Sequence, residues 1–230
     1  RLEFVHGAFS GWFDRTAAEH TAGDKPYAVS PLTSHRGQVG VQVGLLSDVA
    51  HQRFKNATST PTTVRLGNQI REIGQPGPLR QATWTELARE ITERQWTLDL
   101  VTPTTFRSGD RSSPLPAVET IISGLVRSWH LWCNQPDLIP LPTSTQVRSL
   151  WMSDLDLTTE YVDVTINGRS IRFRGALGSI TLRADDDDTA RWAGPLLNYA
   201  AYAGLGSMRA KGLGVAELRC PRSDRSRRSA

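Results

Sequence analysis

The sequence predicts an α+β fold made of two tandem ferredoxin-like (RRM-like) units. The first observation is length, because 230 residues are enough for one large domain or two small ones. The second is the pattern strand, helix, strand, strand, helix, strand, which occurs twice if a strand that mostly precedes Arg1 is counted. The third is a glycine-rich loop before the last strand. We expect domains over residues 1–101 and 102–220, followed by a basic tail over residues 221–230.

The first unit begins with the end of a strand over residues 1–4. Apolar residues at helical spacing predict a helix over residues 6–13. Thr16 and Glu19 form a capping box that starts a second short helix. The remaining expected elements are a strand over 39–46, a hairpin over 62–73 turning at Gly67-Asn68, a helix over 84–94 and a strand over 96–101.

The second unit contains the clearest periodic patterns. Residues 117–133 form a strongly amphipathic helix. Asn167-Gly168 lies between two alternating runs, which predicts a hairpin of strands 161–166 and 169–173. A strand over 176–183, a helix over 189–203 and a strand over 213–220 complete the unit.

The glycine-rich loop excludes two common phosphate-binding motifs. A dinucleotide fingerprint needs its glycines after a strand and at the start of a helix, whereas this loop follows a helix. Lys211 is followed by Gly212, so the Walker pattern is also absent. The charged residues Arg209 and Lys211 on a backbone free of Cβ atoms suit an RNA backbone lying across the loop. A helix C-cap followed by a strand bulge explains the same glycines equally well.

Composition places the chain among globular proteins and indicates a nucleic-acid partner. The net charge is +4, and the last part of the chain is rich in Lys and Arg. Cys133 and Cys220 form no CxxC pair, so we expect no zinc, no cofactor and a reduced, cytoplasmic protein. No apolar run is long enough for a membrane helix, and no signal peptide is visible. The start at Arg1 and not at Met is compatible with a missing N-terminal segment.

Three stretches, in this order, carry a resemblance to a known family. They are HGAF at 6–9 through AEH at 18–20 to KPYAVSPL at 25–32; TPTTF at 102–106 with PLP at 114–116 and the following helix; and FRG at 173–175 with YAGLGS at 202–207 and KGLG at 211–214. Together they resemble the CRISPR-associated endoribonucleases that cut precursor CRISPR RNA at its repeats, within the repeat-associated mysterious protein superfamily.

The resemblance implies an activity and a set of partners. It implies metal-independent cleavage to 2′,3′-cyclic phosphate and 5′-hydroxyl ends, with CRISPR repeat RNA as the partner and retention of the product among other subunits of a CRISPR effector complex. His20 occupies the place of the family's general histidine, and Lys25 that of a lysine a few residues later. Many members have a tyrosine earlier in the helix, where this chain has Val5 and His6.

The expected chemistry fits these residue types. Histidine can act as base or acid in the attack of a 2′-hydroxyl on phosphorus, and Lys25 could stabilise the charge of the phosphorane. His6 is a second catalytic candidate, although fourteen residues on one straight helix would place it about 21 Å from His20. The two histidines can share a phosphate only if the chain folds back near Asp14. The expected RNA-binding residues are Gly204, Gly206, Ser207, Arg209, Lys211, Gly212 and Gly214.

Two other readings stay open. The chain could be a non-catalytic subunit that holds the handle of a guide RNA in an effector complex. It could also be a general RNA-binding module that stacks bases on its sheet, for which Tyr161 and Phe173 are the obvious aromatic residues.

Overall fold

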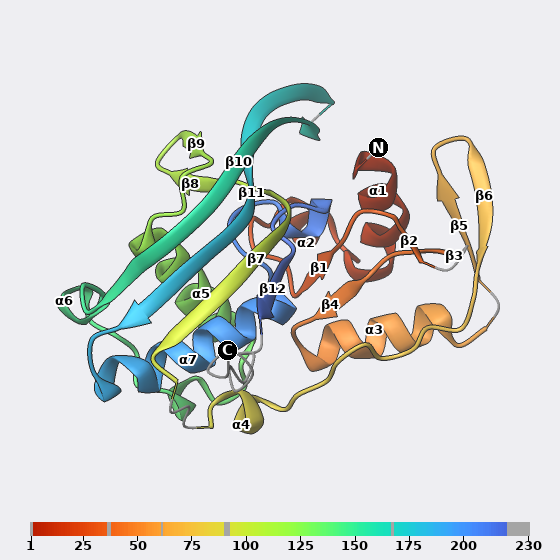
Figure 1. The fold of residues 1–230 in the computed structure, drawn as a ribbon. Helices are drawn as coiled ribbons and strands as arrows, with labels where there is room; N and C mark the ends of the chain where they lie inside the picture. The colour runs from red at the N-terminus through yellow and green to blue at the C-terminus, as the bar shows by residue number, and fades with distance from the viewer. Residues whose placement is uncertain (1, 36–37, 61, 90–92, 167, 220–230) are drawn as a thin grey trace, which may run out of the picture.

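A four-stranded antiparallel sheet and two long helices form the C-terminal half of the protein (Figure 1). The computed structural model describes residues 2–35, 38–60, 62–89, 93–166 and 168–219. The C-terminal elements are β7 (Gln95–Thr104), β8 (Phe106–Ser108), β9 (Arg111–Ser113), α5 (Val118–Trp132), the 3₁₀ helix η1 (Pro136–Leu138), α6 (Ser144–Val147), β10 (Leu150–Ile166), β11 (Arg169–Ala184), α7 (Asp187–Ala203), the 3₁₀ helix η2 (Arg209–Lys211) and β12 (Ala216–Arg219).

The sheet has the order β10–β11–β7–β12, which is the arrangement of a ferredoxin-like βαββαβ unit. Alternation in β7 buries Trp96, Leu98 and Leu100 on the face that carries α5 and α7. The apolar stripe of α5, which includes Ile122 and Trp129, packs into the same core. The predicted helices over 117–133 and 189–203 are therefore confirmed, and with them the α+β class.

Two expectations about strands are corrected by the pairing. Residues 96–101, expected to close the first unit, belong to β7, which pairs with β11 and β12 in the second sheet. The expected boundary between 101 and 102 thus falls inside a strand. Of the strand end expected over residues 1–4, residues 2–4 belong instead to α1, which begins at Leu2, and residue 1 lies outside the described residues. The expected tail over residues 221–230, and Cys220 before it, lie outside the described residues.

The N-terminal half consists of short elements around a second core. They are α1 (Leu2–Phe13), α2 (Ala17–Thr21), β1 (Tyr27–Val29), β2 (Thr33–His35), β3 (Gln38–Gly40), β4 (Val43–Leu45), α3 (Asp48–Thr58), β5 (Thr62–Leu66), β6 (Gln69–Ile73) and α4 (Trp84–Leu87). β1 pairs with β4, and β5 pairs with β6 in the predicted hairpin, with Leu66 opposite Gln69. Of the helix expected over residues 84–94, the described residues form a single turn capped by Thr83, and residues 90–92 lie outside the described part of the chain.

Helix α3 has no counterpart among the expected elements. Ser47 caps it by accepting a hydrogen bond from the backbone N–H of Ala50 at 3.2 Å, and Asp48 lies in its first turn. A serine followed by an acidic residue is the local signal for such a start, although the helix is polar along most of its length.

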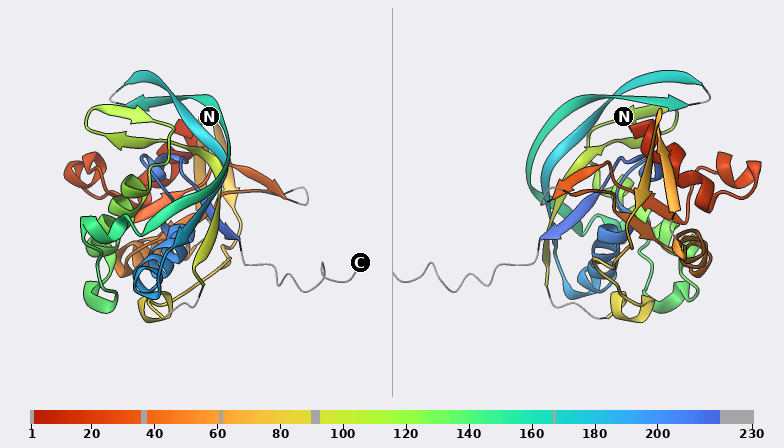
Figure 2. Two further views of the ribbon diagram at one scale, coloured as in Figure 1. Left: turned by 60° about the vertical axis from the view of Figure 1, so that its left-hand side comes forward. Right: turned by 90° about the vertical axis from the view of Figure 1, so that its right-hand side faces the viewer.

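The two halves meet where the C-terminal chain enters the N-terminal core. Ala210, in η2, is buried with Val5, Phe9, Tyr27 and Val29. The β10–β11 hairpin curves over the end of the molecule at which α1 begins (Figure 2). Within the described residues, no helix combines the length and apolar character that a membrane span requires.

Candidate active site

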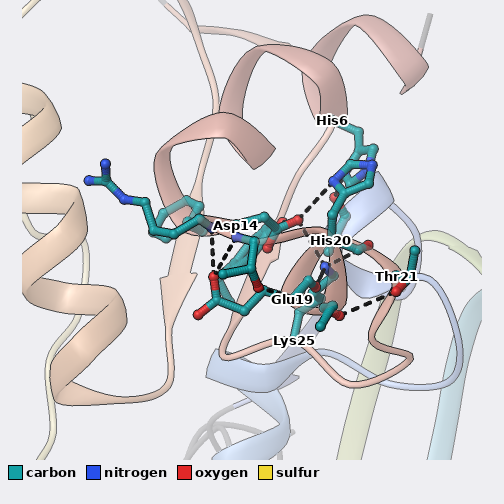
Figure 3. A network of polar contacts seen from close by, with 12 residues as sticks. His6, Asp14, Glu19, His20, Thr21 and Lys25 are labelled. Atoms are coloured by element: carbon teal, nitrogen blue, oxygen red, sulfur yellow. Dashed lines mark hydrogen bonds and ion pairs between the residues drawn. The ribbon is translucent and has the colours of Figure 1, made fainter.

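The chain folds back sharply between α1 and α2, and this turn brings the two predicted histidines together. α1 ends at Phe13, and the capping box of Thr16 and Glu19 starts α2 after three intervening residues. The ring centroids of His6 and His20 are 6.1 Å apart, with the ring planes inclined by 26°. Figure 3 shows the two rings next to each other, close to Asp14. The reversal near Asp14, on which a shared phosphate depends, is confirmed.

His20 lies in the last turn of α2 and is held on one edge by a carboxylate. Its Nδ1 is 3.2 Å from Oδ2 of Asp14. The side chain of His20 is 58 % exposed, whereas that of Asp14 is only 4 % exposed. The buried carboxylate therefore fixes the orientation of the ring through Nδ1, and more than half of the side chain stays accessible to a ligand.

Asp14 is the hub of this network, and its role was not expected from the sequence. The Lys25 ammonium donates to Asp14 Oδ2 at 2.8 Å, and the Tyr27 hydroxyl lies 3.3 Å from the same oxygen. Burial, followed by the charge of Asp14, raises the pKa of Tyr27. Tyr27 thus stays neutral and can donate a hydrogen bond to the carboxylate.

Lys25 is committed to the protein. Besides Asp14, its ammonium donates to the carbonyl of His20 at 2.9 Å and to the carbonyl of Glu19. These contacts use the three N–H groups that a lysine has. Lys25 therefore closes the C-terminal end of α2 and balances the charge of Asp14, and its side chain is only 10 % exposed.

His6 is oriented by a backbone carbonyl from the far end of the chain. Its Nδ1 lies 2.8 Å from the carbonyl oxygen of Ala210. A carbonyl can only accept, so Nδ1 carries the hydrogen and Nε2 has the lone pair when the ring is neutral. Burial lowers the pKa of His6 and outweighs the opposite effect of the bond to Ala210, while the charge of Lys211 lowers it further. His6 is therefore neutral near pH 7.

The glycine-rich loop is packed tightly against backbone. Leu205 N–H donates to the carbonyl of Gly214 at 2.7 Å, and Ser207 N–H to that of Thr105 at 2.8 Å. Gly204, Gly212 and Gly214 are buried with positive φ, whereas Gly206 is exposed and Ser207 half-buried. Gly204, Gly206 and Gly214 permit close backbone packing, because a Cβ at any of them would lie within 2.6 Å of a backbone carbonyl oxygen. Gly206 and Ser207 nevertheless keep accessible surface.

Gly214→Ala is expected to lower the free energy of unfolding by about 3 kcal/mol. A Cβ at this position would lie 1.9 Å from the carbonyl oxygen of Leu205, and φ is +69°. Urea unfolding followed by circular dichroism measures the change. Gly124→Ala is the matched control: this glycine lies in α5 with open space around it, so the substitution is expected to stabilise by about 0.5–1 kcal/mol. Equal midpoints for the two variants would contradict the packing argument.

Arg209 and Lys211, both expected to bind phosphate, differ in where they point. Arg209 Nη1 donates to the carbonyl of Ala203 at 3.2 Å and to Ser128 Oγ at 3.3 Å, and burial lowers the pKa of this guanidinium. Lys211 is close enough to His6 for its charge to lower the pKa of that ring. It donates to the carbonyl of Thr165 at 3.1 Å and is half-buried. Arg209 is therefore directed into the protein, and Lys211 lies at the rim of the site.

Comparison with known proteins places these observations in context. Residues 98–216 match the family model described as CRISPR-associated endoribonuclease Cas6. A Cas6 product complex is 20 % identical, with 95 % of this chain and 93 % of that chain covered and a TM-score of 0.74. Thermus thermophilus Cas6 is 23 % identical, with coverage of 95 % and 91 % and a TM-score of 0.66.

More distant structures share the same arrangement. A Cas6-related protein from Pyrococcus furiosus is 9 % identical, with coverage of 96 % and 89 % and a TM-score of 0.53. No protein in the curated set matches the sequence. The similarity over nearly the whole chain agrees with the tandem ferredoxin-like architecture, including the N-terminal half, where the described strands are short.

Proposed function

The chain belongs to the CRISPR-associated endoribonuclease Cas6 family, and from that premise we propose that it cuts precursor CRISPR RNA within the repeats without a metal ion. The observation that carries the proposal is the facing pair of His6 and His20, whose ring centroids are 6.1 Å apart. One ring is held by a neutral carbonyl and the other by a carboxylate. This difference suits one ring to accept a proton and the other to donate one.

We assign the two proton transfers from this difference. His6 Nε2 removes the proton of the 2′-hydroxyl, whose oxygen forms a bond to the adjacent phosphorus. His20, as the imidazolium supported by Asp14, donates a proton to the 5′-oxygen as its bond to phosphorus breaks. The products are a 2′,3′-cyclic phosphate and a 5′-hydroxyl. The resemblance gives His20 the place of the family's general histidine, and the geometry favours His6 as the base.

Two imidazoles complete both proton transfers, so the mechanism has no step that requires a metal. Full activity is expected in excess EDTA, with one cut in a labelled repeat RNA and ends that carry a cyclic phosphate and a 5′-hydroxyl. Polynucleotide kinase with and without phosphatase activity distinguishes these ends from 3′-hydroxyl and 5′-phosphate ends. Loss of cleavage on chelation, restored by added Mg²⁺, would contradict the metal-independent mechanism.

RNA is proposed to cross the rim of the site at the outward-facing part of the loop. Gly206 offers exposed backbone, Ser207 a half-buried hydroxyl and Lys211 a cation next to the histidines. Lys25 is proposed to act on the reaction through Asp14 and α2 and not by direct contact with phosphate, because its N–H groups are already used. Binding on this rim would allow the product to be retained for a CRISPR effector complex.

The acidic limb of the pH–rate profile is expected below pH 6.5. His6 must be neutral to act as base, and burial lowers its pKa from the ordinary value of 6.5. As the pH falls from 8, kcat/KM is therefore expected to decline gradually through a limb whose midpoint lies below 6.5, because the ring of His6 is progressively protonated. Single-turnover cleavage over pH 5 to 8 at constant ionic strength provides the measurement. A limb centred above 6.5 would contradict the assignment of His6.

A non-catalytic RNA-binding subunit is the second candidate. The observation that favours it is the absence of the tyrosine that many members have early in the first helix, where this chain has the buried Val5 and then His6. Tight binding of repeat RNA by the wild-type protein, with no cut over pH 5 to 8 in either EDTA or Mg²⁺, would support this function over the nuclease.

A further inference from the structure

We propose that η2 is a positioning element for His6 and that Arg209 holds it in place, so that Arg209 serves catalysis without contacting RNA. The inference rests on the proposed function for the role of His6 as base. It gives Arg209 a positioning role, whereas the sequence alone predicts that this side chain binds phosphate.

The first step is that η2 reaches from the C-terminal half into the N-terminal core. Ala210 is 6 % exposed and packs among residues of α1 and β1. Its carbonyl oxygen receives the Nδ1–H of His6 at 2.8 Å. The position of one backbone carbonyl therefore decides how the ring of His6 is turned and which nitrogen is free.

The second step is that η2 depends on contacts outside itself. It is a single turn between two residues with positive φ, Met208 at 61° and Gly212 at 89°. Among the described residues other than glycine, Met208 alone has such a φ, a conformation that costs free energy unless its surroundings enforce it. A turn of this kind keeps its carbonyl in place only if its ends are anchored.

The third step is the anchoring itself, which Arg209 provides on the inner side. Its Nη1 joins the carbonyl of Ala203, at the end of α7, to Ser128 Oγ on α5. Ser128 is buried, and its Oγ is 2.9 Å from the hydroxyl of Tyr199. The guanidinium thus ties η2 to both long helices of the second unit, whereas Lys211 ties it to β10.

Loss of this anchor has a specific consequence for His6. If the carbonyl of Ala210 moves, neutral His6 can exchange between two tautomers, and only the one with a bare Nε2 can accept the 2′-hydroxyl proton. Displacement of the ring also spoils its alignment with the phosphate. We expect Arg209→Met to lower kcat about 10- to 100-fold, with the dissociation constant for repeat RNA within about twofold of wild type.

Lys211→Met on the same turn is the contrasting variant. A rim cation that binds phosphate contributes to affinity and to its salt dependence. This variant is expected to weaken RNA binding and to flatten the dependence of affinity on salt concentration. A rise in the dissociation constant of Arg209→Met to the level of Lys211→Met, with kcat unchanged, would overturn the proposal by showing that Arg209 binds phosphate.

A second measurement does not depend on cleavage. In protein labelled with ¹⁵N-histidine at pH 8, we expect His6 of the wild type to show protonated Nδ1 and bare Nε2, with the signal identified by its loss in His6→Gln. Arg209→Met should give averaged nitrogen shifts at His6. Unchanged shifts in a folded variant would overturn the positioning role, and absence of cleavage by the wild type would refute the nuclease function but not this test.

If the Arg209→Met variant does not fold, Ser128→Ala provides the alternative test of the anchoring role of Arg209. It removes one acceptor of Arg209 and keeps the guanidinium. A smaller decrease in kcat and a smaller change in the His6 shifts, in the same direction, are expected, because the carbonyl of Ala203 still holds the side chain. Wild-type kcat together with wild-type shifts would overturn the proposal.

Discussion

His6→Ala and His20→Ala are each expected to lower the rate of repeat cleavage by about 10²- to 10⁴-fold, the usual contribution of one general acid or base. His6→Ala removes the lone pair that is proposed to accept the 2′-hydroxyl proton, and His20→Ala removes the proposed proton donor to the departing 5′-oxygen. Single-turnover rates with saturating protein measure the chemical step. Affinity for the repeat, measured by filter binding, should change by less than threefold, because neither ring is proposed to hold the RNA.

His130→Ala is the control for these two variants. His130 is exposed on α5, so the His130→Ala variant should cleave at the wild-type rate. The assignments of acid and base can be separated with a substrate whose leaving 5′-oxygen is replaced by sulfur, which departs without protonation. This substrate should restore much of the rate of His20→Ala but not that of His6→Ala. Equal rescue of both variants would contradict the division of roles.

Asp14→Asn is expected to have the second largest effect, on both stability and cleavage. The substitution leaves the Lys25 ammonium, 10 % exposed, without its carboxylate. Breaking a buried ion pair on one side costs about 3–5 kcal/mol, and we expect the lower end because two carbonyls still accept from Lys25. Cleavage should also fall, because the imidazolium of His20 loses the charge that supports it.

The stability and activity effects of Asp14 can be separated in a double variant. Asp14→Asn combined with Lys25→Met removes both charges, so urea unfolding should show a recovery of stability relative to Asp14→Asn. Cleavage should stay low, because His20 still lacks its carboxylate. Asp163→Asn, which breaks the exposed pair with Arg172, is the surface control and should leave both properties near wild type. Full recovery of cleavage in the double variant would show that Asp14 acts through stability alone.

Local patterns in the sequence predicted the parts of the site that depend on neighbouring residues. The capping box of Thr16 and Glu19 predicted a new helix start, and therefore the reversal that brings His20 to His6. The amphipathic pattern over residues 117–133 and the hairpin over 62–73 are likewise set within a few residues of chain. In each case the stabilising contact spans a short stretch that can be read directly.

The parts that could not be predicted depend on distant partners. Alternation in residues 96–101 shows which side chains are buried, but it does not show that β7 pairs with β11 and β12. The carbonyl of Ala210 carries no signal in its side chain, and the partner His6 is 204 residues away. Asp14 could have been suspected as a partner because it lies six residues before His20, on the turn that the capping box predicts.

The contact between His6 and Ala210 also has a consequence for biosynthesis. The ribosome incorporates His6 early in synthesis, but the carbonyl that orients its ring belongs to a residue 204 positions later. Domains generally fold in order during synthesis, at about 5–20 residues per second, so on the order of ten seconds or more separates the two partners. During that interval a growing chain can contain the folded α1–α2 turn with both histidines and still lack the Ala210 carbonyl, which orients His6 for its proposed proton transfer. Cleavage activity is therefore expected to appear late, after the second unit has folded and η2 has packed into the core of the N-terminal half.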